Sequence, residues 1–185
     1  DRWGILIGGR LDKHNMVDNV IFSPRANLRF NPTQNINLRL SYSSGFRAPQ
    51  AFDEDMHIEN VGGTVAMIER AKDLKEEKSQ SFSVSADMYH RFGAFQTNLL
   101  IEGFYTRLTD VFVLGKPYDR GDGILVKTRS NGPGAKVMGL TLEGKVAYLS
   151  ILQIQAGLTL QRSRYDEPHK WHDDAPAEKK IFRTP

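Results

Sequence analysis

Two polar stretches of this 185-residue chain collect the side chains that could bind a ligand or a metal ion. In the first stretch Asp53, Glu54 and His57 stand close together, with Asp55 and Glu59 beside them. Carboxylates and an imidazole suit a hard or borderline metal ion. Their spacing fits no established metal motif, so we expect a solvated loop that can contact a ligand and no bound metal.

The second stretch contains His169, Trp171 and His172, followed by Asp173 and Asp174. A His-x-x-His spacing on a loop could bind a metal chelate, and an exposed tryptophan could stack on a sugar or catecholate ring. A polar loop with one anchoring tryptophan explains the same residues. Both interpretations stay open at this point.

Arg47 and Arg129 lie near the bases of predicted loops, where a guanidinium group could attract an anionic ligand. Pairing with acids of the neighbouring strands, such as Glu102 or Glu143, is the alternative. The serines alternate along strands rather than standing beside a histidine and an orienting acid, so the sequence predicts no catalytic residues and no cofactor. Because the chain has no cysteine, thiolate metal sites, disulfides and cysteine nucleophiles are excluded.

Composition places the chain among folded proteins, with 39% hydrophobic and 25% charged residues. The net charge of +3 is scattered in both signs and predicts no nucleic-acid partner. Charges or amides interrupt every apolar run well before the roughly 18 residues of a membrane-spanning helix, whereas barrel strands need only about 9–11 residues. Asp1 leads almost directly into an apolar segment, so we expect a piece of a longer protein.

Period-two alternation is the dominant pattern, and it predicts long strands with one apolar and one polar face. Three segments show it most clearly on their apolar side: Ile36, Leu38, Leu40 and Tyr42; Phe82, Val84, Ala86 and Met88; and Leu152, Ile154, Ala156, Leu158 and Leu160. Serine, threonine, glutamine and arginine occupy most of the intervening positions.

The connections fall into two lengths, which predicts that short turns lie at one end of the sheet and long loops at the other. The predicted long loops occupy about 13–24, 44–78, 109–123 and 165–180, and 67–78 is expected to be a loop or a short surface helix. Residues 123–148 are expected to form one path with a break at 131–134. Residues 1–185 then form a single all-β antiparallel meander, a barrel segment of about seven strands with an eighth beginning near Ile181.

Two stretches resemble the barrel of TonB-dependent outer-membrane receptors, of a Bacteroidetes-like type. The first covers Arg25–Pro32 and Leu38–Gln50, which contains the text S-S-G-F-R-A-P. The second covers Thr128–Asn131, Ala135 and Gly139–Glu143, where Thr141 stands at a position at which the family often has glutamate. The likeness extends over nearly the whole chain.

This resemblance implies a barrel of about 22 strands with an N-terminal plug, located in the outer membrane of Gram-negative bacteria. It would import an iron chelate, cobalamin or an oligosaccharide with energy from the TonB complex, contacted through the missing N-terminal part. The chain would supply about a third of that barrel, with membrane lipid on its apolar face. The alternative is a soluble β-sandwich or small-barrel ligand-binding module, in which the apolar faces would point inward.

Overall fold

The computed structural model describes residues 2–15, 17, 19–49, 66–121, 125–149, 151–169 and 177–180. These residues form strands joined by turns and loops, and none of them belongs to a helix that could cross a membrane. The strands are β1 Trp3–Asp12, β2 Ile21–Thr33, β3 Ile36–Arg47, β4 Ala66–Arg70, β5 Glu77–Phe92, β6 Phe95–Thr109, β7 Phe112–Leu114, β8 Tyr118–Asp119, β9 Leu125–Asn131, β10 Ala135–Tyr148, β11 Leu152–His169 and β12 Glu178–Lys180.

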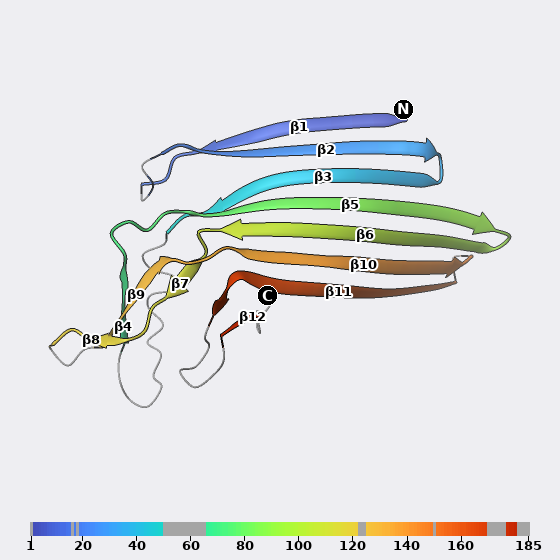
Figure 1. The fold of residues 1–185 in the computed structure, drawn as a ribbon. Helices are drawn as coiled ribbons and strands as arrows, with labels where there is room; N and C mark the ends of the chain where they lie inside the picture. The colour runs from blue at the N-terminus through green and yellow to red at the C-terminus, as the bar shows by residue number, and fades with distance from the viewer. Residues whose placement is uncertain are drawn as a thin grey trace.

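The long strands, together with the short β12, form one antiparallel sheet in the order β1-β2-β3-β5-β6-β10-β11-β12 (Figure 1). Neighbours in the sheet are also successive long strands in the chain, so the sheet is an up-and-down meander, as the alternation predicts. The β2–β3, β5–β6 and β10–β11 turns all lie at the right-hand end in Figure 1, and the longer connections lie at the left. We call these the turn end and the loop end.

A second, smaller sheet stands at the loop end, in the order β4-β9-β7 with β8 also paired to β9. β4 runs parallel to β9, whereas β7 and β8 run antiparallel to it. The expectation of a loop or a short helix over 67–78 is therefore wrong for its first part. Residues 66–70 are a strand because β9 supplies backbone partners that a sequence pattern does not reveal.

The bounds of the predicted loops also need correction, because strands enter all four ranges. β2 begins at Ile21, β3 extends to Arg47 and β11 extends to His169, while β4, β7, β8 and β12 lie inside ranges expected to be loops. On β11 both faces are largely polar beyond Leu160, so the alternation ends there although the strand continues to His169. The predicted break at 131–134 agrees with the structure, where β9 ends at Asn131 and β10 of the main sheet begins at Ala135.

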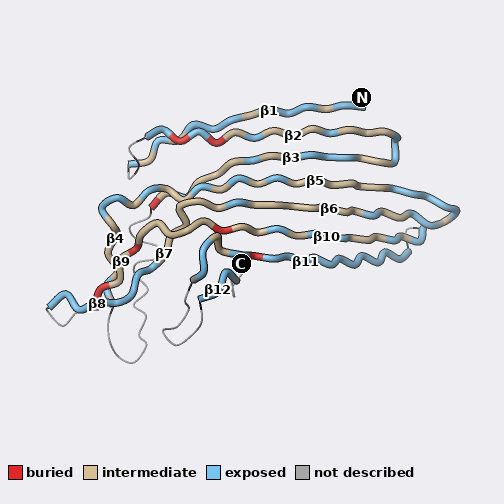
Figure 2. The backbone as a smooth tube through the Cα atoms, viewed as in Figure 1, coloured by how far each residue is buried: buried red, intermediate tan, exposed pale blue. Residues whose placement is uncertain are grey.

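Buried aliphatic side chains are few in the described part of the chain, and they lie towards the loop end (Figure 2). They are Val17, Ile21, Val126 and Ala135. Val126 of β9 is completely buried, and Arg129 of the same strand is only 7% exposed. The long strands have no apolar core on either side, so something outside the described chain must cover their apolar face.

The ring of Phe104 lies on the polar face of the sheet, where it covers Gly139 of the neighbouring β10. A methyl group at Gly139 would approach the Phe104 ring to 2.5 Å and the Leu160 backbone oxygen to 2.7 Å. Only glycine accepts both neighbours at this position. An aromatic ring over a strand glycine is a known way to fix the register between two strands.

Candidate functional site: a membrane-facing wall with a polar inner surface

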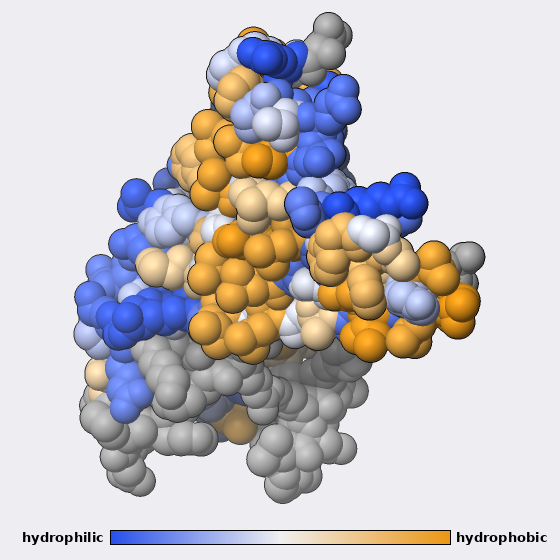
Figure 3. All heavy atoms as spheres, turned by 90° about the vertical axis from the view of Figure 1, so that its right-hand side faces the viewer, coloured by the Kyte–Doolittle hydropathy of each residue, from blue (hydrophilic) through white to orange (hydrophobic). Residues whose placement is uncertain are grey.

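Large apolar side chains form a continuous surface on one face of the main sheet. Strand register aligns one row across seven strands, and its members are Ile5, Leu28, Leu40, Val84, Gly103, Leu140 and Leu160. Leu40 is 53% exposed, Val84 60% and Leu160 61%. Figure 3 looks onto the turn end and shows hydrophobic residues over the centre and lower right of the view, with hydrophilic residues along its left side.

Along β10 the apolar residues have a sharp limit on the loop side. The same face carries Tyr148, Val146, Leu142, Leu140 and Met138, and then changes to a charged residue at Lys136. From Tyr148 to Met138 is a step of ten residues, or roughly 33 Å along the strand. With strands tilted by the roughly 35–45° of membrane barrels, this is a band about 25 Å high, the thickness expected of a lipid-facing belt.

The band also runs obliquely to the strand rows. On β11 its loop-side limit is Leu160, which shares a row with Ile5 of β1, but on β1 the apolar side chains continue to Leu11, six residues further (11 − 5). Six residues extend roughly 20 Å along a strand. β1 and β11 are six strand spacings apart, which is roughly 29 Å across the sheet. A flat membrane therefore requires strands tilted by roughly 35°, which is the tilt of a transmembrane barrel.

Aromatic rings collect on the apolar face near the turn end. The Trp3 and Phe30 rings stack with centroids 4.2 Å apart, and Phe95 lies 5.5 Å from Phe92 and 5.0 Å from Tyr148. Aromatic side chains favour the boundary between lipid and water. The turn end of the band therefore carries side chains suited to a membrane–water boundary.

The opposite face is polar and its side chains are hydrogen-bonded across the strands. The Ser41 hydroxyl donates to Asn27 at 2.5 Å, and the Thr141 and Thr159 hydroxyls lie 3.0 Å apart. The Gln155 amide donates to the Glu143 carboxylate at 2.6 Å. Such a face suits a water-filled or plug-filled lumen and would be costly to turn towards hydrocarbon.

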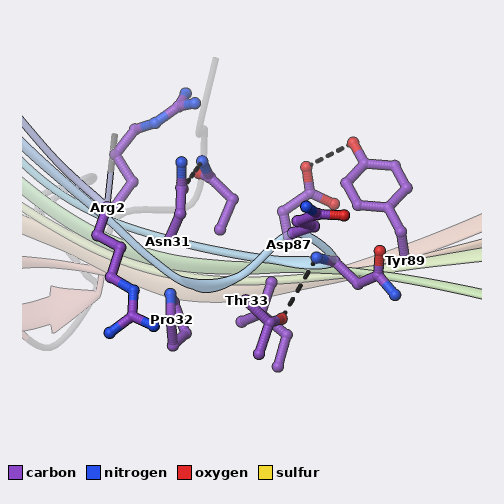
Figure 4. A pocket seen from close by; sticks show the side chains of 11 residues that line it. Arg2, Asn31, Pro32, Thr33, Asp87 and Tyr89 are labelled. Atoms are coloured by element: carbon purple, nitrogen blue, oxygen red, sulfur yellow. Dashed lines mark hydrogen bonds between the residues drawn. The ribbon is translucent and has the colours of Figure 1, made fainter.

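A polar cavity of about 640 Å³ lies at the turn end, beside the β2–β3 turn (Figure 4). The Asn37 amide donates to Asn31 at 2.7 Å, and the Tyr89 hydroxyl donates to Asp87 at 2.8 Å. Arg39 also lines the cavity. The cavity can therefore accept hydrogen-bonding and charged groups, and an apolar ligand would fit it poorly.

At the loop end Asn131 joins three segments of the chain. Its amide nitrogen donates to the backbone oxygens of Lys75 at 3.0 Å and Asp110 at 2.8 Å, and its amide oxygen accepts from the Lys75 nitrogen at 2.8 Å. The Glu77 carboxylate accepts from the Phe112 nitrogen at 3.0 Å. These bonds attach the small sheet to the end of the main sheet.

Glu76 contributes charge to the same region. Burial by itself would raise the pKa of the Glu76 carboxyl, but a backbone hydrogen bond and Lys78, whose Nζ lies 3.0 Å from Glu76 Oε1, hold the pKa below its usual value. Because the pKa is lowered, the ionised Glu76 carboxylate stabilises the folded state at neutral pH. This stabilisation is lost as the pH falls through the folded-state pKa.

The structure describes only two of the predicted ligand-binding residues, Arg47 and His169. Arg47 is exposed at the loop end of β3, and its guanidinium carbon lies 5.6 Å from the centre of the Phe112 ring. His169 is the last residue of β11 and pairs with Glu178 of β12. Asp53, Glu54, His57, Trp171 and His172 lie outside the described residues, so the structure does not bring the predicted set together.

The expected alternative for Arg47, pairing with Glu102 or Glu143, does not fit the register. Arg47 pairs with Glu77 at the loop end of β5, whereas Glu102 pairs with Ser85, much further along the same strand. Glu143 lies in the next polar row beyond Glu102 and accepts the Gln155 hydrogen bond. Within the ranges that the structure describes, no three acidic, histidine or cysteine side chains converge as a metal site would require.

An oblique, exposed apolar band on one face and a hydrogen-bonded polar surface on the other define the wall of a transmembrane β-barrel. The soluble-module alternative requires the apolar rows to be enclosed, and they are exposed on a single layer. A family model described as "TonB dependent receptor-like, beta-barrel" matches residues 1–185. The chain therefore belongs to this family, whose members are transporters rather than enzymes and lie in the Gram-negative outer membrane.

Solved structures have the same fold. The siderophore receptor PirA from Pseudomonas aeruginosa superposes with a TM-score of 0.71 at 18% identity, over 89% of this chain and 32% of that one. The FrpB iron transporter from Neisseria meningitidis (F3-3 variant) gives a TM-score of 0.57 at 19% identity, over 80% of this chain and 20% of that one. The chain thus spans between a fifth and a third of these proteins, and no curated protein sequence matches it.

Proposed function

We propose that this chain is part of the barrel wall of a receptor that imports an iron chelate across the outer membrane. The observation that carries the proposal is the pairing of a lipid-facing band with a polar inner surface in a chain of the TonB-dependent receptor family. The two solved relatives described above are named as an iron transporter and a siderophore receptor, which favours iron chelates over cobalamin or an oligosaccharide.

The loop end would be the side from which the nutrient arrives, and the turn end would face the periplasm. Arg47, Asp53, Glu54, His57, His169, Trp171 and His172 are our proposed ligand-contacting residues. Support comes from the loop-end position of Arg47 and His169, together with the chemistry of the five others. Cations and aromatic rings at the mouth of a channel suit an anionic chelate with catecholate rings.

The polar cavity at the turn end supports a second part of the proposal, which concerns the plug of the complete receptor. Arg39 and Asp87 offer both charges to a polar partner at this cavity. We infer that the plug occupies this surface and that its N-terminal end reaches the TonB complex.

A Bacteroidetes origin is likewise a proposal, which the genome sequence around the gene would test.

Growth under iron limitation tests the transported nutrient. Deleting the gene of the complete receptor is expected to abolish growth on the cognate ferric chelate, with less than a tenth of the parent's uptake of radioactive iron, because the chelate is too large for passive diffusion. Growth on cobalamin and oligosaccharide sources is expected to stay unchanged. Normal iron uptake combined with a loss of cobalamin or oligosaccharide uptake would contradict the iron proposal and leave the barrel assignment intact.

The loop residues can be tested separately from barrel assembly. In the complete receptor, Trp171→Ala is expected to weaken ligand binding by roughly 10-fold, since stacking on one aromatic ring contributes about 1–1.5 kcal/mol. The measurement is the binding constant of the purified receptor for the ferric chelate, followed by fluorescence quenching. The control Trp3→Ala removes a ring of the turn-end belt and is expected to leave binding unchanged. Equal affinity of Trp171→Ala and the parent would remove Trp171 from the proposed site.

A further inference from the structure

A cluster of cations lies on the outer face of the main sheet, directly beyond the loop-side limit of the apolar band. Lys136 of β10 pairs with Arg107 of β6 on one side and with Arg164 of β11 on the other, so these three residues form one row. Arg162 lies one row nearer the band, opposite Met138. We call Arg107, Lys136, Arg162 and Arg164 the outer basic collar.

Register shows that the collar faces outward and not into the lumen. Side chains two residues apart on a strand share a face. Arg107 therefore follows Tyr105, Lys136 follows Met138, and Arg162 and Arg164 follow Leu160, all of which belong to the apolar face. Arg107, Arg162 and Arg164 are exposed.

The charge of the collar is only partly balanced by its neighbours. Asp166 is the next outward residue of β11, and its Oδ1 atom lies 2.6 Å from Lys136 Nζ. On β5 the same row continues with the neutral Gln80, and beyond it Lys78 pairs with Glu76. Within the described part of the chain, these four cations make one ion pair, between Lys136 and Asp166, at the boundary between hydrocarbon and water.

We propose that the outer basic collar binds the phosphate groups of membrane lipid headgroups in the outer leaflet. The inference rests on the proposed function, because it requires the apolar band to lie in the membrane. Continuity with that band argues for a lipid as the occupant, since one molecule can place its acyl chains on Leu140 and Leu160 and its phosphates on the collar. The long Arg and Lys side chains suit this position, because their stems lie on apolar surface while their charges reach the headgroups.

The test uses the complete receptor purified in detergent and titrated with bisphosphorylated lipid A, with native mass spectrometry counting bound lipids. The triple variant Arg107→Gln, Lys136→Gln, Arg164→Gln is expected to bind on the order of 100-fold more weakly, as each cation near an anionic surface contributes about a fivefold factor. Arg164→Gln alone is expected to bind roughly fivefold more weakly. The parent, Arg164→Gln and the triple variant are expected to bind dephosphorylated lipid A with equal affinity.

A matched control lies on the same strand but on the opposite face. Lys145→Gln changes the same charge on the polar side of β10 and is expected to leave lipid binding unchanged. Two results would overturn the proposal: equal binding by the parent, Arg164→Gln and the triple variant, or an equal loss with dephosphorylated lipid. A failure of the proposed function would give a different result. In that case the complete receptor would not extract from outer membranes as a heat-modifiable barrel, which would contradict the membrane assignment itself.

Discussion

Replacing Leu140 by arginine is expected to lower the free energy of unfolding of the complete receptor barrel by about 2–4 kcal/mol. Leu140 lies between Gly103 and Leu160 in the row that crosses seven strands. If the band is embedded in lipid, an arginine at this depth must enter hydrocarbon or distort the bilayer. The measurement is equilibrium unfolding by guanidinium in lipid vesicles, followed by tryptophan fluorescence.

The neighbouring residue of the same strand provides the control. Thr141 lies on the polar face, where its hydroxyl is 3.0 Å from that of Thr159. Thr141→Arg is expected to cost about 1 kcal/mol, the contribution of one hydrogen bond, because its charge would enter the hydrated lumen. If Thr141→Arg proved the more destabilising change, the orientation of the wall would be the reverse of that described here.

Removing the amide of Asn131 is expected to detach the small sheet from the end of the main sheet. Asn131→Ala loses three hydrogen bonds to the backbone of Lys75 and Asp110, which together contribute about 2–3 kcal/mol. The main sheet keeps its own pairing and is expected to stay intact. In hydrogen exchange, the Lys75 amide of the complete receptor should exchange about 30–100-fold faster than in the parent.

Two further variants separate this effect from a general loss of stability. Asn131→Asp keeps the oxygen that accepts from Lys75 but loses both donated bonds, so an intermediate rate is expected. Asn98→Ala removes donated bonds to Asp87 and Met88 at the other end of the sheet and is expected to leave Lys75 exchange unchanged. Parent-like exchange in Asn131→Ala would show that other contacts hold the small sheet in place.

Much of the fold could be predicted from the sequence because side-chain alternation is a local property. Leu38, Leu40 and Tyr42 lie on one face of β3 whatever the neighbouring strands are, and the same holds for Phe82, Val84 and Met88 on β5. Chain direction then reverses at each connection, so the lengths of the connections suffice to place short turns at one end. The family resemblance added the direction in which the apolar rows point.

The candidate site could be predicted only as a set of residues. The sequence places Arg47 at a strand end, but the Phe112 contact of Arg47 joins segments separated by 65 positions (112 − 47), and no local pattern encodes such a contact. The outer basic collar had no signal of its own in the sequence. Arg107, Lys136 and Arg164 are scattered cations until the register of three strands aligns them.

The sequence by itself determined which residues form long strands, which faces of those strands are apolar and at which end the short turns lie. Only the tertiary structure decided the register, the oblique course of the band, the parallel pairing of β4 with β9 and the loop-end role of Asn131. The physical reason is that alternation follows from the geometry of consecutive residues, whereas pairing depends on backbone hydrogen bonds between segments that loop closure brings together.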